Sequence, residues 1–250
     1  MKLLILTPTR NRLGYLRENI ESVRMSSFAP LEIELVQALH DCGSDDGTAA
    51  WLETLRGDPR LHITLSPRAL PPGQARNLAA ASAPGDFIMP LDDDDLLLQR
   101  TAHHFLHALS TSNARWAVAD FLTIDRDGRY LPGKDYYAWR FGSADEMLQA
   151  IFSGRHYIQG NVCFTRALFE QVGRYAEDME TAEDLELYTR FILEAGLPLY
   201  IPMISHLHRL HHLNLSRDVD KDRYNGDMAA IYERHRSKLE ARGIRLELIL

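Results

Sequence analysis

The chain has 250 residues, of which 45% are hydrophobic and 25% are charged, the balance of an ordinary globular protein with one large domain or two small ones. Its 28 Lys and Arg against 35 Asp and Glu leave a net charge of −7, which disfavours a protein that coats nucleic acid. Four acidic residues stand in a row at positions 92–95, so part of the surplus negative charge is local.

Cysteine usage and hydropathy indicate the compartment. Cys42 and Cys163 are too few for a disulfide framework and stand in no zinc-binding spacing, which is typical of a reducing cytoplasm. The N-terminal apolar run is too short for a signal peptide, and the apolar stretch 197–204 is broken by Pro198 and Pro202. We expect a cytoplasmic protein without a membrane-spanning helix, and peripheral contact with the inner face of the membrane stays open.

The first hundred residues alternate short apolar runs with segments of helical periodicity. The runs predict strands over 3–7, 31–35, 61–65 and 86–91, and the periodic segments predict helices over 13–25, 46–55 and 74–81. This alternation is typical of a parallel, doubly wound α/β sheet. Such sheets bind their ligands at the carboxyl ends of the strands, so the loops that follow the strands are the places to search for a site.

The second half is less regular. We expect helices over 100–109, from the capping box at 143–146, over 181–195 up to Gly196, and over 220–242. Strands are predicted over 116–124 and 158–165, with a turn at Asp127 and Gly128 that folds residues 130–131 back. The segments predict one α/β domain over 1–217, followed by a helical extension over 218–250.

The acidic run at 92–95 directly follows the predicted strand 86–91. Adjacent carboxylates repel one another unless positive charge neutralises them. At the carboxyl end of a buried strand they suit a hard divalent cation such as Mg²⁺ or Mn²⁺, which keeps open positions for phosphate oxygens. The alternative interpretation is a solvated acidic turn.

Polar motifs also follow the three preceding strands. They read PTRNR at 8–12, DCGSDDGT at 41–48 and GQARN at 73–77. Together with DDDD at 92–95, in this order, they resemble the PTxNR, DDGSxDGT, GxARN and DxDD motifs of the family-2 glycosyltransferases. The resemblance is close over 3–98 and continues more loosely to about 216. It implies a GT-A fold, a mainly parallel mixed sheet flanked by helices, with a nucleotide-sugar-binding half at 1–98 and an acceptor half at 99–217.

The resemblance also implies the site residues. Asp184, in the segment TAEDLELYTR, is the expected general base, and Asp94 is the expected metal ligand. His211 is the further metal ligand, because the segment 208–216 is similar to the family's YRxHxxNxS stretch. Arg76 would orient the acidic run and add to the neutralisation of the diphosphate. The residues expected to bind the nucleotide sugar are Pro8, Thr9, Arg10, Asn11, Asp41, Arg76, Asp92 and Asp93.

The function that the resemblance implies is inverting hexosyl transfer from a nucleoside-diphosphate sugar, with a UDP-sugar as the expected donor. Mg²⁺ or Mn²⁺ is the expected cofactor, and the acceptor is a hydroxyl of a saccharide, a lipid-linked molecule or another compound. Cell-surface polysaccharide or glycoconjugate synthesis is the expected setting, without nucleic acid as a partner. Aromatic residues between the motifs are either an acceptor platform or core residues: Tyr136, Tyr137, Trp139 and His156.

Departures from the family pattern leave alternatives open. Cys42 replaces the second Asp of DDGS, and Arg10 replaces a common aromatic residue, so a catalytically impaired nucleotide-binding module is one alternative. Another metal-dependent phosphoryl or nucleotidyl enzyme is a second, disfavoured because the acidic run follows the fourth strand and not the first. Smaller interpretations are a diphosphate contact by Arg209 or Arg217, solvated side chains at His206, His208 and His212, and a helix cap at Thr181.

Overall fold

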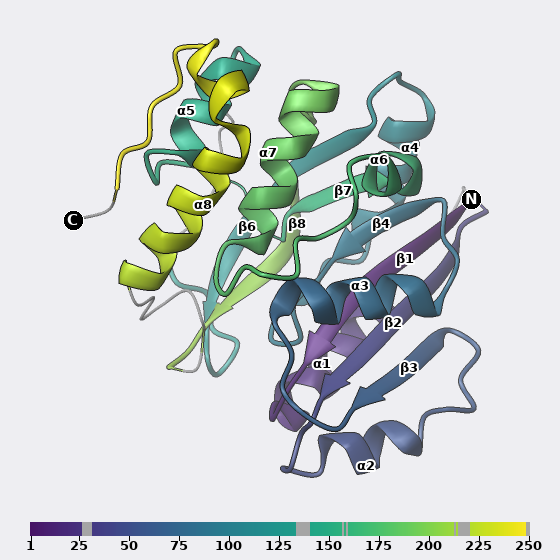
Figure 1. The fold of residues 1–250 in the computed structure, drawn as a ribbon. Coiled ribbons are helices and arrows are strands. Elements are labelled where there is room, and N and C mark those ends of the chain that lie inside the picture. The colour runs from purple at the N-terminus through teal and green to yellow at the C-terminus, as the bar shows by residue number, and fades with distance from the viewer. Residues whose placement is uncertain are drawn as a thin grey trace.

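The structure is a computed structural model, and it describes residues 1–26, 32–133, 141–156, 158, 160–212, 214 and 221–248. Its centre is an eight-stranded mixed sheet in the order β3-β2-β1-β4-β7-β6-β8-β5 (Figure 1). Helices cover both faces of this sheet, which confirms the predicted α/β class.

The first half of the sheet is parallel, as predicted. Its strands are β1 (Lys2–Thr9), β2 (Glu34–Cys42), β3 (Leu61–Ser66) and β4 (Phe87–Pro90), and its helices are α1 (Leu13–Arg24), α2 (Thr48–Glu53) and α3 (Pro72–Ser82). β2 begins later than the predicted 31–35 and runs to Cys42, because the buried segment from Val36 onward pairs with β1. The motif DCGS therefore starts inside the strand and not in the loop after it.

The second half makes the sheet mixed. It contains β5 (Leu96–Leu97), α4 (Thr101–Ser110), β6 (Trp116–Asp125), α5 (Ala144–Ile151), β7 (Val162–Thr165), α6 (Arg166–Gln171), α7 (Glu183–Ala195), β8 (Leu199–Leu210) and α8 (Lys221–Glu240). β7 is antiparallel to β4 and β6, and β5 is antiparallel to β8. β6 and β8 are parallel to each other and run in the direction of β1–β4, so the carboxyl ends of all six meet at one edge.

Two features of the second half differ from the sequence interpretation. No strand was predicted over 199–210, where β8 forms, and Pro202 lies where the register of β8 against β6 shifts. Proline is tolerated at such bulges because the ladder hydrogen bond is already missing there. Thr181 does not cap the following helix: α7 begins after Ala182, and the Thr181 hydroxyl donates to Asp227 in α8.

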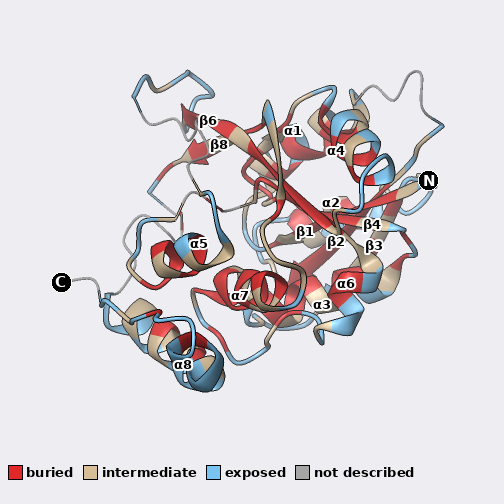
Figure 2. Ribbon diagram, turned by 90° about the horizontal axis from the view of Figure 1, so that it is seen from above, coloured by how far each residue is buried: buried red, intermediate tan, exposed pale blue. Residues whose placement is uncertain are grey.

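The core lies on both sides of the sheet because alternate strand residues point to opposite faces. Leu4 and Leu6 pack with α3, α5, α6, α7 and α8, whereas Leu3 and Ile5 pack with α1 and α4. In Figure 2, α7 is buried and α8 has an exposed outer face, yet Met228 in α8 belongs to the same core cluster as Leu4. In the described part of the chain, no helix combines the length and apolarity needed to cross a bilayer. The predicted domain boundary at 217 and 218 lies outside the described residues and stays a prediction.

Candidate functional site

Residues 92–95 form a turn between β4 and β5 at the shared carboxyl edge, and we call them the acidic turn. The Asn19 side-chain amide holds this turn, donating to the carbonyls of Asp92 and Asp95 at 2.8 Å each. Asn19 is fully buried in α1 beside the apolar residues Leu16 and Ile20. A polar residue on the apolar stripe of a helix was the sequence signal for this role, and sequence reasoning missed it.

Arg12, the last residue of PTRNR, neutralises part of the acidic turn. Its Nη1 lies 2.9 Å from Asp93 Oδ1 and 2.5 Å from Asp94 Oδ2. The Thr9 hydroxyl, a predicted site group, donates to Asp93 Oδ2 at 2.6 Å. Burial nevertheless raises the pKa of Asp93 to about 7 against the opposing charge of Arg12. Arg12 therefore does not fully offset the burial of the Asp93 carboxyl, and Arg12 is a site residue that the predicted set omitted.

Asp94 and His211, the predicted metal ligands, are brought together. His211 Nε2 lies 2.9 Å from Asp94 Oδ2, and the Asn214 amide donates to the same oxygen at 3.3 Å. The His211 ring stacks on Tyr15 of α1 at 4.7 Å between centroids, which fixes its orientation. Oxygens of Asp92, Asp94 and Asp95 lie within 4.8 Å of one another, a set that fits a hard divalent cation.

The motif GQARN joins the acidic turn to the second half of the chain through Arg76. The Arg76 guanidinium donates to Asp92 at 2.7 Å and also to Glu183, the first residue of α7. Gly73 lets α3 lie close to the backbone at Ala176, because a Cβ at position 73 would overlap the carbonyl of Ala176. The Asn77 side chain completes the contact by pairing with the backbone of Tyr175 in both directions. Arg76 therefore contacts the acidic turn, which it was expected to orient, and also the start of α7, a contact that the sequence did not predict.

Asp184 lies in the first turn of α7, beside Glu183 and close enough to Arg76 and Asp92 to feel both charges. Its Oδ1 accepts the backbone N–H of Leu185 at 2.7 Å. Burial raises the pKa of Asp184 to about 6 against the pull of Arg76, and Asp92 adds to the rise. A half-buried carboxylate with this pKa is deprotonated at neutral pH and can accept a proton from a hydroxyl.

The loops after β1 and β2 are bonded to each other. Asn11 has a left-handed backbone (φ 54°), and its side-chain oxygen accepts the N–H of Asp45 while its own N–H donates to the Ser44 hydroxyl. Buried Asp41 accepts the N–H of Ser44 through Oδ2, and its Oδ1 has no partner among the described residues. This leaves a buried acceptor at the base of the two loops. Of the other two predicted residues here, Pro8 lies in β1 and Arg10 is exposed.

Cys42 is not a nucleophile in this arrangement. Its side chain is buried, and burial together with Asp41 raises the pKa of the thiol to about 11. The thiol is therefore protonated at neutral pH, and covalent catalysis by Cys42 is not supported.

Two of the histidines near the end of β8 are not the solvated side chains that the sequence allowed. His206 is buried and His208 contacts Asp95, so neither is a solvated loop residue, whereas His212 is exposed. Arg209 is also buried, with its guanidinium bonded to Glu18 at 2.6 Å and to the Asp94 carbonyl at 2.8 Å. This arrangement makes Arg209 a brace for the acidic turn and argues against a diphosphate contact. Four residues considered from the sequence lie outside the described residues: Tyr136, Tyr137, Trp139 and Arg217.

Comparison with known proteins identifies similar sequences. A model of the family described as glycosyl transferase family 2 matches residues 4–173. In sequence the chain is 31% identical over 102 residues to the poly(ribitol-phosphate) beta-N-acetylglucosaminyltransferase TarS of Staphylococcus aureus. That match covers 40% of this chain and 18% of TarS, so it extends over a small part of the relative.

Solved structures share the fold. The crystal structure of Staphylococcus aureus TarS 1–349 in complex with UDP-GlcNAc has a TM-score of 0.68 at 18% identity, covering 95% of this chain and 73% of that one. A mannosyltransferase from Pyrobaculum calidifontis, in complex with GDP-Man and Mn²⁺, has a TM-score of 0.66 at 16% identity, covering 94% and 64%. The mixed sheet with flanking helices is thus the architecture of these glycosyltransferases.

Proposed function

Since the chain belongs to glycosyl transferase family 2 and is a glycosyltransferase, we propose that it transfers a hexose from a nucleoside-diphosphate sugar to an acceptor hydroxyl, with inversion. A UDP-sugar is the proposed donor, because Staphylococcus aureus TarS, which shares this fold, was solved in complex with UDP-GlcNAc. The loops after β1 and β2 would receive the nucleoside, with Asp41 offering its buried Oδ1 as a hydrogen-bond acceptor.

Asp94 and His211 would hold a divalent cation, Mg²⁺ or Mn²⁺, with Asp92 beside them. When bound, such an ion neutralises the charge that develops on the departing diphosphate. The residues fit the ion because the acidic turn holds buried carboxylates that Arg12 and Arg76 only partly offset. Arg76 fixes the turn from the side of α7.

The observation that carries the proposal is the contact of Arg76 with both Asp92 and Glu183. It supports a site in which the acidic turn, on the donor side, lies beside Asp184, the proposed base. The acceptor oxygen would lose its proton to Asp184 as it attacks the anomeric carbon from the face opposite the diphosphate. A single displacement of this kind inverts the anomeric centre and needs no enzyme nucleophile, which agrees with the protonated Cys42 thiol.

The acceptor is proposed as a saccharide or lipid-linked hydroxyl compound of cell-surface polysaccharide or glycoconjugate synthesis. The cytoplasm is the proposed compartment, since Cys42 and Cys163 are both free thiols in the structure. Contact with the inner face of the membrane belongs to the same proposal, as the place where a lipid-linked acceptor would be met.

The test is sugar transfer by the wild-type protein and by Asp184→Asn, with UDP- and GDP-sugars and a panel of hydroxyl acceptors. We expect Asp184→Asn to bind the nucleotide with unchanged affinity and to transfer about 10²–10⁴-fold more slowly, the usual contribution of a general base. Glu180→Gln is the matched control, an exposed carboxylate just before α7. Wild-type rates in Asp184→Asn, or cleavage of phosphate bonds without sugar transfer, would contradict the proposal.

A further inference from the structure

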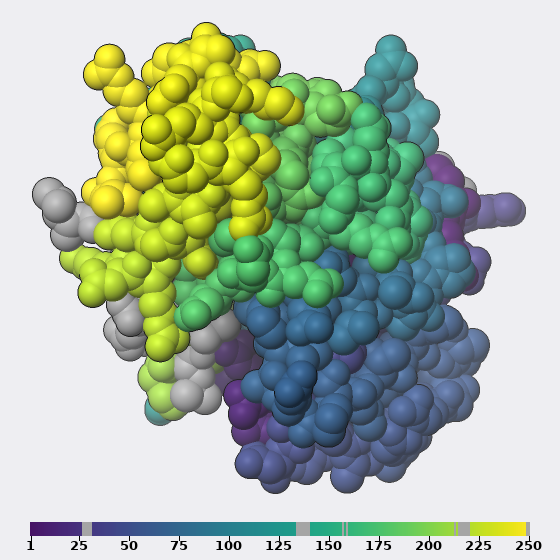
Figure 3. Space-filling model, viewed as in Figure 1, coloured from purple at the N-terminus to yellow at the C-terminus, as the bar shows by residue number. Residues whose placement is uncertain are grey.

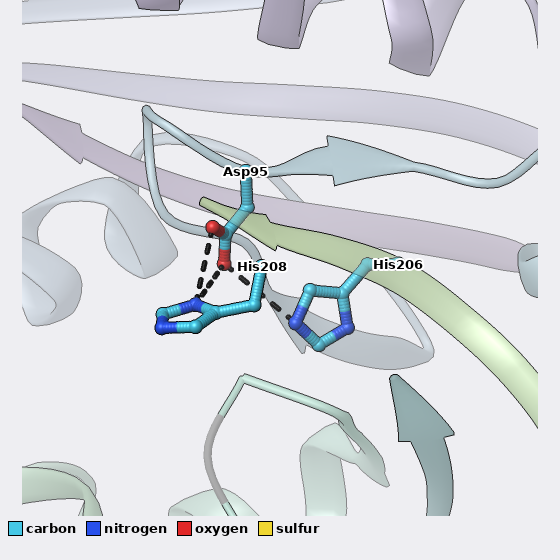
Figure 4. A group of neighbouring side chains, drawn as sticks. All are labelled: Asp95, His206 and His208. Atoms are coloured by element: carbon cyan, nitrogen blue, oxygen red, sulfur yellow. Dashed lines mark hydrogen bonds and ion pairs between the residues drawn. The ribbon is translucent and has the colours of Figure 1, made fainter. Parts of the chain in front are cut away.

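Three metal-ligating side chains gather behind the acidic turn: Asp95, His206 and His208 (Figure 4). His206 and His208 are two residues apart on β8 and therefore lie on the same face of the strand. β5 pairs antiparallel with β8, and this pairing places Asp95, the residue before β5, against them. The ligating atoms of the three side chains lie within 4.8 Å of one another.

The hydrogen bonds of Ser205 determine which His206 nitrogen carries the hydrogen. The Ser205 hydroxyl donates its only hydrogen to the Asp120 carbonyl at 2.9 Å. It must therefore accept from His206 Nδ1, which lies 2.9 Å away. In the neutral ring, a hydrogen on Nδ1 leaves Nε2 as a bare lone pair.

That lone pair faces a carboxylate. His206 Nε2 lies 3.6 Å from Asp95 Oδ2, is buried, and has no hydrogen-bond partner among the described residues. The His206 and Asp95 side chains are 1% and 3% exposed, so water does not screen the repulsion between the two acceptors. A cation between the two atoms would relieve this repulsion.

His208 completes the set of ligands. Its Nδ1 lies 3.2 Å and 3.3 Å from the two oxygens of Asp95, longer than the roughly 2.8 Å of a tight charge-assisted hydrogen bond. Phe121 stacks on the His206 ring at 5.1 Å and meets the His208 ring edge-on at 5.7 Å, giving the cluster an apolar wall. The His208 side chain is 13% exposed and leaves a route of entry.

We propose that Asp95, His206 and His208 form a Zn²⁺ site distinct from the Mg²⁺ or Mn²⁺ position at Asp94 and His211. Two imidazoles and one carboxylate are typical zinc ligands, whereas Mg²⁺ prefers oxygen ligands. The two positions lie on different sides of the acidic turn, since Asp94 Oδ2 faces His211 and Arg12 while Asp95 faces His206 and His208. Ser205 is the outer partner that orients the His206 ring, as metal-bound histidines usually require.

The ion would have a structural role. It would link β8 to the acidic turn, which carries Asp94. These two segments are far apart in the sequence, and the pairing of β5 with β8 brings them together. Three protein ligands leave a fourth position that water can fill. Without the ion, the pair of His208 with Asp95 is the contact that remains.

The test is metal binding by the whole protein, stripped with a chelator, with Zn²⁺ alone and no nucleotide. We expect one Zn²⁺ per chain by equilibrium dialysis and metal analysis, a rise in melting temperature, and no displacement by excess Mg²⁺. Co²⁺ in place of Zn²⁺ should give the visible bands of a four-coordinate nitrogen and oxygen site.

Variants separate the two positions. His206→Gln should weaken Zn²⁺ binding by more than the roughly 10–100-fold typical of an outer-shell change. Asp94→Asn and the control His62→Gln, in β3, should keep it. If His206→Gln does not fold, Zn²⁺ binding by His208→Gln and the Co²⁺ spectrum of the wild-type protein test the proposal instead. If the wild-type protein binds no Zn²⁺, the proposal is wrong and the three side chains form an ion pair only. If Zn²⁺ binding is lost in Asp94→Asn but kept in His206→Gln, the ion belongs to the donor site.

Discussion

Arg76 is the residue on which the site depends most, because its guanidinium contacts carboxylates from two distant segments. It is 10% exposed, and Glu183 is 7% exposed, so the ion pair between them is largely withdrawn from water. Removing one partner of a buried pair leaves the other charge uncompensated, which is usually more costly than the pair was worth.

Arg76→Met is therefore expected to lower the free energy of unfolding by about 3 kcal/mol, near the lower end for breaking a buried pair. Urea denaturation monitored by circular dichroism measures this. Arg56→Met is the matched control, since the pair of Arg56 with Glu53 is about half exposed and should matter little. Equal loss of stability in the two variants would contradict the role given to Arg76.

Asp184 determines how the rate of sugar transfer is expected to depend on pH. A base with a pKa of about 6 is protonated, and inactive, below that pH. We expect kcat/KM at saturating metal to be flat above pH 7 and to fall about tenfold per pH unit well below 6. Asp184→Asn should lose this limb while keeping a low residual rate. A limb centred near the ordinary Asp value of about 3.9 would show that burial does not act on this carboxyl as described.

The sequence motifs predicted which residues meet, since the carboxyl ends of parallel strands share an edge, and Thr9, Arg76 and Asp94 are all found there. They could not predict which partner each of the four adjacent carboxylates contacts. Residues in a turn have no periodicity, so the pairing of Asp93 with Arg12 and of Asp95 with His208 depends on three-dimensional contacts alone.

At the scale of elements, α8 holds the segment that leads into α7. Within the described chain α7 has no side-chain cap. Asp227 of α8 instead fixes the residues just before the helix: its Oδ2 accepts the backbone N–H groups of Glu180, Thr181 and Ala182 at 3.0, 2.7 and 3.2 Å, and the Thr181 hydroxyl as well. In Figure 3 the yellow C-terminal segment lies directly against the green segment that contains α7. The helix that carries Asp184 is thus anchored by the C-terminal part of the chain.

Asp227→Ala should cost about 1.5–3 kcal/mol of unfolding free energy, the usual contribution of a hydrogen bond to a charged group. We expect a larger effect on kcat than on nucleotide affinity, because Asp227 contacts the loop before Asp184 and not the β1 and β2 loops. Asp227→Asn, which keeps an oxygen acceptor, should restore most of both. Kinetics and thermal unfolding of the three proteins measure this, and an Asn variant as impaired as the Ala variant would contradict the role of Asp227 as an acceptor.

β8 shows why elements were harder to predict in the second half. It is a twelve-residue strand whose prolines and histidines give no regular strand pattern in the sequence. It pairs with β6 through two register shifts. The short apolar runs and periodic segments of the first half are regular, and apart from β2, which runs on to Cys42, its strands and helices were predicted within a few residues. β8 forms because β6 supplies a partner, and no local pattern encodes that.

At the scale of the molecule, the parallel strands direct the acidic turn, the base and the β1 and β2 loops to one edge. The net charge of −7 is therefore partly a property of this edge, where Asp92, Asp93, Asp94 and Asp95 exceed the nearby arginines. A site of this composition should bind a nucleoside diphosphate well only when a divalent cation offsets the charge of both.

The most direct measurement is calorimetric titration of UDP into the zinc-free protein, with and without Mn²⁺, for the wild type and Asp94→Asn. GDP and CMP serve as comparison nucleotides. The account predicts that Mn²⁺ strengthens UDP binding to the wild type by at least about tenfold, or 1.4 kcal/mol, and that Asp94→Asn abolishes this gain. UDP binding that is the same with and without Mn²⁺, or a Mn²⁺ effect that survives in Asp94→Asn, would contradict it.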